Sequence, residues 1–253
     1  DKGDYLCYEI EYRGGMYPYH LESILPTFVY ESGKWLPDKR VPAPGMIGCD
    51  REVELRIGYF GDSITQGIGT APNAYTHWCA LVAGMLGERY SHWNLGIGYG
   101  RCQDAATGGA WFFKAKHVDT AVVTFGSNDV GRGRSLDEMK ADFSTLVDRL
   151  HAANVKVLLQ TLPPFDWQGE QLERWLAINA WLKTELAPKT EEFLDVAPLL
   201  TDLTRGVGMS KYGKHPDEAG CFIWAEALLP KMKNFLNFYG NNGVLRSKRN
   251  ITE

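Results

Sequence analysis

The sequence predicts an α/β fold, a three-layer α/β/α sandwich with a mostly parallel five-stranded sheet, preceded by a β-rich N-terminal arm. From Glu54 onward, short apolar runs alternate with stretches of helical periodicity, the order that builds a parallel sheet. Residues 1–53 instead alternate polar with apolar or aromatic residues between turn signals. Small and polar residues follow several of the apolar runs, where such sheets place their ligand sites.

The N-terminal arm, residues 1–53, is expected to consist of short strands and turns. The alternation of polar and apolar residues is clearest at 5–12 and 27–33. Gly14-Gly15, Pro37-Asp38 and the stretch 42–45 are turn signals. We expect an extended arm, or part of a small β-domain, that covers part of the main core.

The main domain is expected at residues 54–240, followed by a polar tail at 241–253. A chain of 253 residues is long enough for one well-buried domain with an appendage. The apolar runs predict strands at 55–60, 91–95, 120–125, 155–161 and 192–196. Helical faces are predicted for these sets: Tyr75, Trp78, Leu81, Val82 and Met85; Met139, Phe143, Leu146, Val147 and Leu150; Leu172, Trp175, Leu176, Asn179, Leu182 and Leu186; Phe222, Ala225, Leu229, Met232 and Phe235. The last helix is expected to begin with Pro216 at its first position.

Composition indicates which classes of partner and which cellular compartment to expect. The net charge is −4 and the basic residues are scattered, so no nucleic acid partner is expected. No apolar run approaches the roughly 20 residues that cross a bilayer, so no membrane partner is expected. The five cysteines have irregular spacing, which favours a reducing, cytoplasmic compartment, with a removed leader peptide as the alternative. The histidines show no metal-ligand spacing, and no cofactor is expected.

Ser63 is the first candidate for chemistry. It follows an apolar run, in Gly61-Asp62-Ser63-Ile64-Thr65, and precedes Gly-rich turn residues and a helical pattern. A strand-to-helix bend presents a hydroxyl beside free backbone N–H groups, as a nucleophile requires. An ordinary turn with a capping side chain explains the same residues equally well.

Three further segments supply the remaining parts of an acyl-transfer site. They are 94–101 after the second predicted strand, 126–129 after the third, and His215 in the loop after the fifth. Each alone has an ordinary explanation as a turn or a helix cap. Together they provide Ser63 as nucleophile, His215 as general base, and Asn128 with backbone N–H groups as oxyanion donors.

These segments resemble the four blocks of the SGNH hydrolases, the GDSL esterase and lipase group, over residues 54–237. Gly61 to Thr65 resembles the first block, Gly126-Ser127-Asn128-Asp129 the third, and His215-Pro216 the last. The second block usually shows Asn-x-Gly-x-x-Gly, whereas here Tyr99 stands at the last glycine's spacing from Asn94. One inserted residue would make Gly100 the oxyanion-hole glycine, with Gly98 as the alternative. The resemblance implies a flavodoxin-like fold, with Ser63 and His215 catalytic and Gly100 and Asn128 in the oxyanion hole.

One departure from the family concerns the group that orients the histidine. The family normally has an aspartate three residues before it, where this chain has Tyr212. Losing the acid of a Ser-His-Asp site costs about 10⁴ in turnover if nothing replaces it. A backbone carbonyl could orient His215 in a dyad, another carboxylate such as Asp202 or Asp217 could replace the acid, or the enzyme has decayed. The dyad is favoured because Ser63, Asn128 and His215 are all retained.

The expected function is hydrolysis of short-chain esters, with acetyl esters of carbohydrates favoured. The partner is therefore a small-molecule or carbohydrate ester. Trp111, Trp167 and Trp224 are candidates for a sugar platform, with core packing as the default. Segment 161–167 is expected to line the pocket, and no lipase-like apolar lid is evident. Two alternatives stay open, namely an acyltransferase of the same fold and a catalytically decayed glycan-binding protein.

Overall fold

The computed structural model describes residues 19–20, 27–38, 41–42, 52–71, 75–107, 115 and 117–241. The chain falls into two compact units, Asp1–Arg51 and Glu52–Glu253, and each is described by itself. Trp111, Cys7, Cys49 and positions 242–253 of the expected tail lie outside the described residues.

The described residues of the first unit form two antiparallel pairs of strands. β1 (Tyr19–His20) pairs with β4 (Val41–Pro42), and β2 (Thr27–Glu31) pairs with β3 (Lys34–Asp38). Ser32 and Gly33 join β2 to β3 with φ angles of 52° and 78°, the left-handed backbone that a two-residue hairpin loop needs. The expected β-rich arm is therefore confirmed for the described residues. The turn expected at Pro37-Asp38 is wrong, because Pro37 lies within β3 opposite Phe28, where a two-stranded ribbon tolerates its missing N–H.

The second unit is built on a five-stranded parallel sheet. Its strands are β5 (Leu55–Gly61), β6 (Tyr90–Gly96), β7 (Thr120–Thr124), β8 (Lys156–Gln160) and β9 (Glu192–Leu194). Their order in the sheet is β6-β5-β7-β8-β9, and every neighbouring pair is parallel. All five predicted strands are thus confirmed, and so is the predicted fold class. The strand order reverses between the neighbouring strands β5 and β7, and in such sheets ligands bind beyond the carboxyl ends of the strands at this point.

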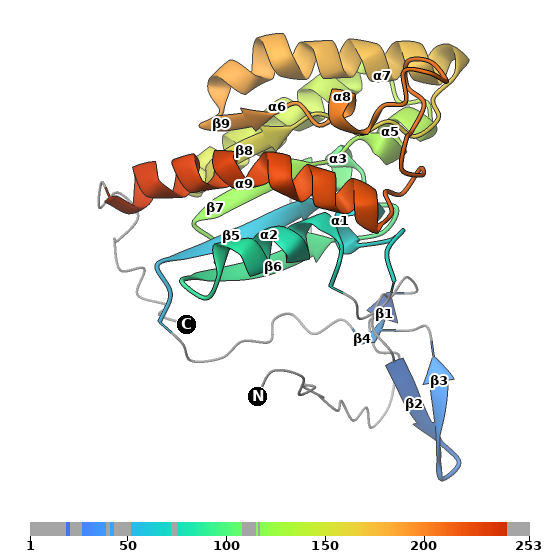
Figure 1. Ribbon diagram of the computed structural model, residues 1–253, viewed down its shortest axis with the longest axis vertical. Coiled ribbons are helices and arrows are strands. Elements are labelled where there is room, and N and C mark those ends of the chain that lie inside the picture. The colour runs from blue at the N-terminus through green and yellow to red at the C-terminus, as the bar shows by residue number, and fades with distance from the viewer. Residues whose placement is uncertain are drawn as a thin grey trace. The chain divides into compact units, whose positions relative to one another are not determined.

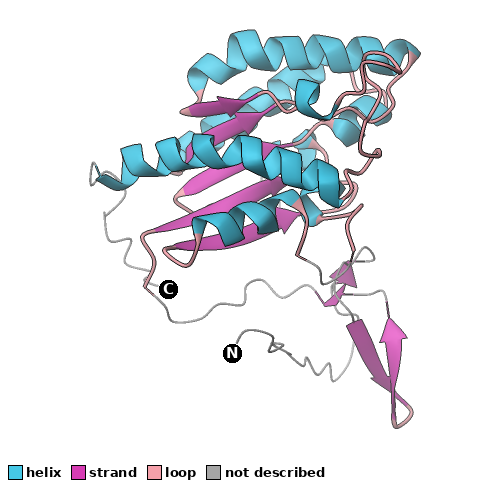
Figure 2. Ribbon diagram, in the orientation of Figure 1, coloured by secondary structure: helices cyan, strands magenta, loops and turns pink. Residues whose placement is uncertain are grey.

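Helices cover both faces of the sheet (Figures 1 and 2). The described helices include α1 (Ser63–Gln66), α2 (Trp78–Leu86), α3 (Cys102–Ala106), α5 (Ser127–Gly131), α6 (Leu136–Ala152), α7 (Gly169–Trp181), α8 (Ala197–Leu200) and α9 (Glu218–Asn241). A π-helical turn (Leu182–Leu186) and a 3₁₀ turn (Ala187–Lys189) extend α7. The helices α2 and α9 pack on one face, and α3, α6 and α7 on the other. None of the helices in the described ranges is both long and apolar enough to cross a bilayer.

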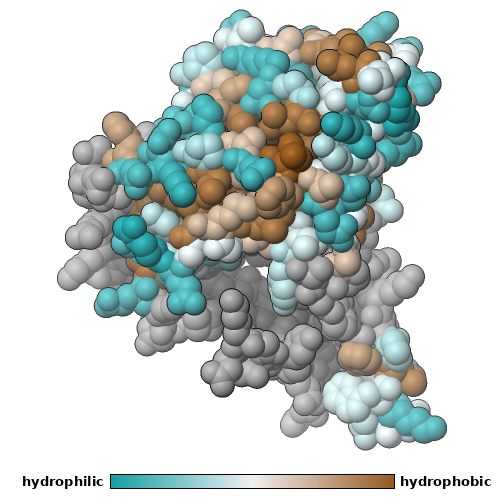
Figure 3. Space-filling view, viewed as in Figure 1, coloured by the Kyte–Doolittle hydropathy of each residue, from teal (hydrophilic) through white to brown (hydrophobic). Residues whose placement is uncertain are grey.

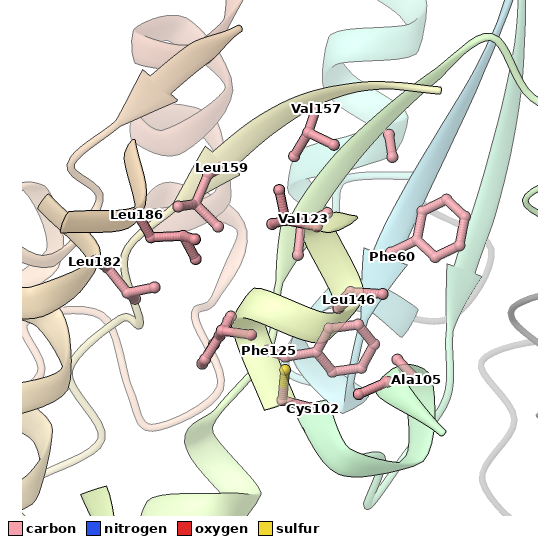
Figure 4. Packing of buried hydrophobic residues seen from close by; sticks show 14 of the residues in the cluster. Phe60, Cys102, Ala105, Val123, Phe125, Leu146, Val157, Leu159, Leu182 and Leu186 are labelled. Carbon is pink, nitrogen blue, oxygen red and sulfur yellow. The ribbon is translucent and has the colours of Figure 1, made fainter. Parts of the chain in front are cut away.

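The core has two halves, one on each face of the sheet. Neighbouring strand residues alternate between them, so that Phe60 and Val123 pack on the α6 side while Tyr59 and Val122 pack on the α9 side. Figure 4 shows the first half, where Phe60, Val123, Val157 and Leu159 of the strands meet Cys102, Ala105, Leu146, Leu182 and Leu186 of the helices. The central strands β5, β7 and β8 are buried on both faces and therefore consist largely of apolar residues, which explains why they could be found in the sequence.

The thiols that the structure describes, those of Cys79, Cys102 and Cys221, are buried and unpaired. Cys79 Sγ donates to the Thr65 carbonyl at 3.3 Å, and Cys221 Sγ donates to the Pro216 carbonyl at 3.5 Å. Burial raises the pKa of Cys221 to about 12, so this group stays a protonated thiol near neutral pH. These cysteines therefore act as core residues with weak hydrogen bonds.

The predicted helical faces are correct for α6 and partly wrong elsewhere. The five α6 positions are all buried, namely Met139, Phe143, Leu146, Val147 and Leu150. Leu176 and Phe222, however, are 44% and 45% exposed, and Leu228 rather than Leu229 is buried in α9. Apolar and polar residues are interspersed on the face that carries α9 (Figure 3). Tyr75 lies before α2 with a φ of 52°, because that helix begins later than the pattern indicates.

The start of α9 also differs from the expectation for Pro216. The helix begins at Glu218, and Asp217 is its cap: Asp217 Oδ1 accepts the Gly220 N–H at 2.9 Å, and its carbonyl accepts the Cys221 N–H at 2.9 Å. An aspartate side chain satisfies an unpaired N–H of the first turn, which proline cannot do. The capped helix start follows directly after His215 and Pro216.

Leu146→Ala should destabilise the protein by about 2 to 5 kcal/mol, because Leu146 is 1% exposed and its loss leaves a cavity in the core. Leu176→Ala, the matched control on another helix, should change the free energy of unfolding by less than about 1 kcal/mol, since Leu176 is 44% exposed. Urea unfolding followed by circular dichroism measures both. Equal losses would contradict the described packing.

Candidate active site

Ser63 lies at the bend between β5 and α1. Asp62 caps the helix, its Oδ1 accepting the Ile64 N–H at 3.0 Å, and Ser63 is the first helical residue. Gly61 makes the bend possible, because a Cβ there would lie 2.6 Å from the Thr124 carbonyl oxygen. The serine is 9% exposed, and its backbone N–H donates to no acceptor within the described residues. The sequence prediction of a strand-to-helix bend at Ser63 is confirmed.

His215 lies against the Ser63 side chain. Its Nε2 is 2.9 Å from Ser63 Oγ, although the two residues are 152 positions apart in the chain. Gly69, with a φ of 106°, packs against this segment so tightly that a Cβ would lie 2.7 Å from the carbonyl oxygens of His215 and Pro216. The Phe165 ring meets the imidazole edge-to-face, with 5.2 Å between the centroids. The segment 161–167 thus reaches the site, as its position after β8 predicted.

The segment after β6 packs closely on α1. A Cβ at Gly96 would lie 2.6 Å from the Thr65 carbonyl carbon, so only glycine fits without displacing the helix backbone. Asn94 supports this approach: its Oδ1 accepts the Gly96 N–H at 3.0 Å and its Nδ2 donates to the Gln66 carbonyl at 3.3 Å. The end of β6 and the helix of Ser63 therefore form one closely packed unit.

The turn at 97–100 uses most of its backbone N–H groups internally. Gly98 N–H donates to Gln66 Oε1 at 2.8 Å, and Gly100 N–H donates to the Ile97 carbonyl at 3.0 Å. Tyr99, between the two glycines, has a φ of 60°, and its N–H donates to no acceptor within the part of the chain that the structure describes. The two glycines expected as alternative oxyanion donors thus both have engaged N–H groups, while the N–H of Tyr99 is available.

Asn128 brings the fourth segment to the same place. It lies in the first turn of α5, directly after β7, and its Nδ2 donates to the Gly100 carbonyl at 3.0 Å. The neighbouring Asp129 is fully buried; its Oδ2 accepts the Cys102 N–H at 3.0 Å, and its Oδ1 lies 3.4 Å from Arg134 Nε. Burial raises the pKa of the Asp129 carboxyl. Asp129 thereby joins α5 to α3 and fixes Asn128 beside the 97–100 turn.

Asp202 and Asp217, the carboxylates considered as replacements for the missing acid, both accept hydrogen bonds from residues that follow them closely in the chain. Asp202 Oδ1 accepts both the backbone N–H and the hydroxyl of Thr204, at 3.0 and 2.6 Å. Asp217 Oδ1 caps α9. Tyr212 packs, partly buried, against the core on the α9 side. A Cβ at Gly220 would lie 2.6 Å from the Tyr212 Cβ, so the tyrosine fills space beside α9.

The tryptophans considered as a sugar platform belong to the core where the structure describes them. Trp224 is fully buried, stacks on Trp78 with 4.7 Å between the ring centroids, and donates to Gln160 Oε1 at 2.7 Å. Trp167 is 4% exposed. Among the described residues, no three His, Cys, Asp or Glu side chains form a group that could hold a metal ion.

A sequence model of the GDSL-like lipase/acylhydrolase family matches residues 59–221, a range that contains Ser63, Asn128 and His215. The chain belongs to this family. The match begins within β5 and ends in the first turn of α9, so it spans all of the segments that meet at the site.

Solved structures of GDSL-type proteins share the fold. A putative G-D-S-L lipolytic protein from Desulfitobacterium hafniense DCB-2 is similar over 70% of this chain and 98% of its own, with a TM-score of 0.58 and 18% identity. A mutant of an acetylxylan esterase from Geobacillus stearothermophilus is similar over 73% of this chain and 96% of its own, with a TM-score of 0.57 and 22% identity. A carbohydrate acetylesterase from Sinorhizobium meliloti is similar over 71% of this chain and 99% of its own, with a TM-score of 0.54 and 18% identity. A search of curated protein sequences gave no match.

Within this GDSL-like chain, sequence reasoning missed two contacts at the site. Gln66 lies one helical turn after Ser63 and accepts the Gly98 N–H, and its place directly after the first block is the only sequence signal for it. Tyr99 stands at the glycine spacing, so an ungapped count from Asn94 favours it over Gly100. Its left-handed φ of 60° is the conformation that glycine adopts most easily.

Gly96→Ala should destabilise the protein by about 1 to 3 kcal/mol, because the new Cβ has to displace the backbone of α1. Gly84→Ala is the matched control: Gly84 lies within α2, a Cβ there meets nothing within 4 Å, and the change should be neutral or stabilise by up to about 1 kcal/mol. Thermal unfolding of the two variants measures the difference. A Gly96→Ala protein as stable as Gly84→Ala would show that β6 and α1 are not in this close contact.

Proposed function

We propose that this GDSL-like protein is a serine esterase that hydrolyses short-chain carboxylic esters, with acetyl esters of carbohydrates as the favoured substrates. The observation that carries the proposal is the 2.9 Å contact between Ser63 Oγ and His215 Nε2. This pair supplies a nucleophile and a base within hydrogen-bond reach, beside Asn128. The esterase titles of structural neighbours, two of them acting on acetylated carbohydrates, support the substrate class.

The reaction proceeds through an acyl-enzyme. His215 Nε2 accepts the hydroxyl proton as Ser63 Oγ attacks the carbonyl carbon, and the tetrahedral intermediate carries the negative charge on the former carbonyl oxygen. His215 then protonates the departing alcohol oxygen, and the C–O bond to the alcohol breaks. Water enters, His215 takes its proton, and the second tetrahedral intermediate collapses to free acid and Ser63.

Three N–H groups hold the oxyanion in this mechanism. Ser63 supplies its own N–H, which lacks an acceptor within the described residues. Tyr99 supplies the second in place of Gly100, because the Gly100 N–H already donates to the Ile97 carbonyl. Asn128 supplies the third, since its amide has two N–H bonds and only one is used on the Gly100 carbonyl. Gln66 assists indirectly by holding Gly98, the residue before Tyr99.

Packing orients the imidazole in the proposed Ser-His dyad. The Phe165 ring lies edge-to-face with His215, and the Gly69 backbone contacts the His215 and Pro216 carbonyls, so the segment is restrained from two sides. The hydrogen bonds of Asp202 and Asp217 to their own loops favour the dyad over a substitute acid. Retention of the whole nucleophile, base and amide arrangement favours a working enzyme over a decayed one.

Ser63→Ala and His215→Ala should each lower kcat/KM by at least about 10³-fold, because each removes a member of the proton-transfer pair. Release of p-nitrophenol from the acetyl and butyryl esters measures the loss. Ser144→Ala, on α6, serves as the control and should keep wild-type activity. Full activity in Ser63→Ala would end the proposal, and the absence of any turnover in the wild type would favour a binding protein.

Asn128→Ala should lower kcat for p-nitrophenyl acetate by about 10² to 10³-fold with little change in KM, because an oxyanion donor acts in the transition state. Asn128→Asp keeps the shape but loses the N–H and should be equally impaired. Asn237→Ala, on the exposed side of α9, is the control and should leave both constants unchanged. If Asn128→Ala raised KM alone, the amide would bind the ground state and not the oxyanion.

A further inference from the structure

Tyr99 has a conformation and an exposure that its place in the 97–100 turn does not require. Its φ of 60° is unfavourable for a bulky side chain, whereas glycine would adopt it freely. The side chain is 64% exposed, so burial of the ring does not compensate for the backbone conformation. Strained residues that the surrounding structure holds in place cluster at ligand sites. The ring is therefore a candidate for contact with a ligand.

The contacts of the ring place it beside Asn128. Arg132 Cζ lies 6.0 Å from the centroid of the Tyr99 ring. Arg132 follows Asn128 by one helical turn, and its N–H donates to the Asn128 carbonyl at 3.0 Å, so the two side chains share one side of α5. The bond from Asn128 Nδ2 to the Gly100 carbonyl ties the same turn to the same helix. The ring consequently extends along α5 at the edge of the proposed oxyanion hole.

The Arg132 guanidinium is available to a ligand. It is exposed, it makes no direct ion pair or side-chain hydrogen bond with the residues that the structure describes, and its charge acts on the nearby Asp104 carboxylate. Two nearby arginines are engaged: Arg101 Nη2 lies 2.9 Å from Asp104 Oδ1, and Arg134 Nη2 lies 2.6 Å from Asp142 Oδ2. Arg132 thus combines an aromatic neighbour with unused N–H donors.

We propose that Tyr99 and Arg132 form a subsite for a sugar ring of the ester substrate. The C–H face of a pyranose stacks on the phenol ring, and hydroxyl or carboxylate oxygens of the same sugar accept hydrogen bonds from Arg132. The inference rests on the proposed function, which places the reacting carbonyl beside the Tyr99 N–H and hence within reach of the Tyr99 side chain.

The pairing of these two side chains favours a sugar over an alkyl chain. An alkyl chain lying on Tyr99 would remove water from the neighbouring guanidinium without replacing its hydrogen bonds, which is costly. A sugar offers an apolar face to the ring and oxygens to the arginine. Trp224 and Trp167 are buried, so neither can supply such a surface.

Direct binding to the Ser63→Ala protein tests the subsite without turnover. The probes are acetylated xylo-oligosaccharides and acetylated oligogalacturonides, titrated by calorimetry. Tyr99→Gly keeps the backbone N–H and removes the ring, and it should weaken binding about tenfold, while Tyr99→Phe should stay within about threefold. Arg132→Gln should weaken the binding of the carboxylated oligogalacturonides more than the binding of the neutral xylo-oligosaccharides. Arg89→Gln, which alters an exposed arginine next to the amino end of β6, should bind like the parent.

Kinetics give a second readout in the active enzyme. The ratio of kcat/KM for the acetylated oligosaccharides to kcat/KM for p-nitrophenyl acetate should fall about tenfold in Tyr99→Gly and recover in Tyr99→Phe. Equal losses on both substrates, with circular dichroism unchanged, would show that the ring only supports the turn and would overturn the subsite. Failure of the Ser63→Ala protein to bind either probe would also overturn it.

The outcomes for the two proposals can be separated. Cleavage of p-nitrophenyl acetate that depends on Ser63, combined with sugar binding that is unchanged in Tyr99→Gly, would support the esterase proposal and overturn the subsite proposal. Sugar binding that depends on Tyr99, in a protein that cleaves no ester, would sustain the subsite and overturn the esterase.

Discussion

The 2.9 Å contact between Ser63 Oγ and His215 Nε2 depends on backbones that approach more closely than side chains would permit. Gly61 brings β5 against the Thr124 carbonyl, Gly96 brings β6 against α1, and Gly69 brings the turn after α1 against the His215 and Pro216 carbonyls. Each contact would be blocked by a single methyl group. The site is thus assembled by main-chain packing, and the reactive side chains are added to a frame that has little freedom to move.

The sheet topology explains why four distant segments can share this frame. Ser63 follows β5, the 97–100 turn follows β6, Asn128 follows β7 and Phe165 follows β8, and parallel strands end at one edge of a sheet. In Figure 1 the helices α1 and α5 and the first turn of α9 lie at that edge. Side-chain bonds then fix the details: Gln66 holds Gly98, and Asn128 holds Gly100.

Much of this arrangement could be predicted from the sequence, because it depends on patterns of burial. The central strands β5, β7 and β8 are buried on both faces and appear as apolar runs, and chemically suggestive residues follow β5 and β7 directly. Helix faces were less certain, since Leu176 and Phe222 fit the helical period and still face solvent. An apolar residue at a surface position costs little, so periodicity alone cannot identify it.

The N–H group proposed for the oxyanion hole could not be predicted from the sequence for a different reason. In a sequence, glycine marks a backbone that can approach closely, and Gly98 and Gly100 both fit that description. The distinction lies in which N–H groups already have acceptors, and that depends on the Gln66 side chain and on the Ile97 carbonyl. Only the hydrogen bonds of the folded turn distinguish Tyr99 from the two glycines.

Two thiols in the α2 and α9 layer link the segments of the proposed nucleophile and the proposed base to the same part of the core. Cys79 donates to Thr65 in the helix of Ser63, and Cys221 donates to Pro216 beside His215. The layer that carries these cysteines therefore contacts both the segment of Ser63 and the segment of His215. If the proposed roles hold, activity and the packing of α2 on α9 should be lost together.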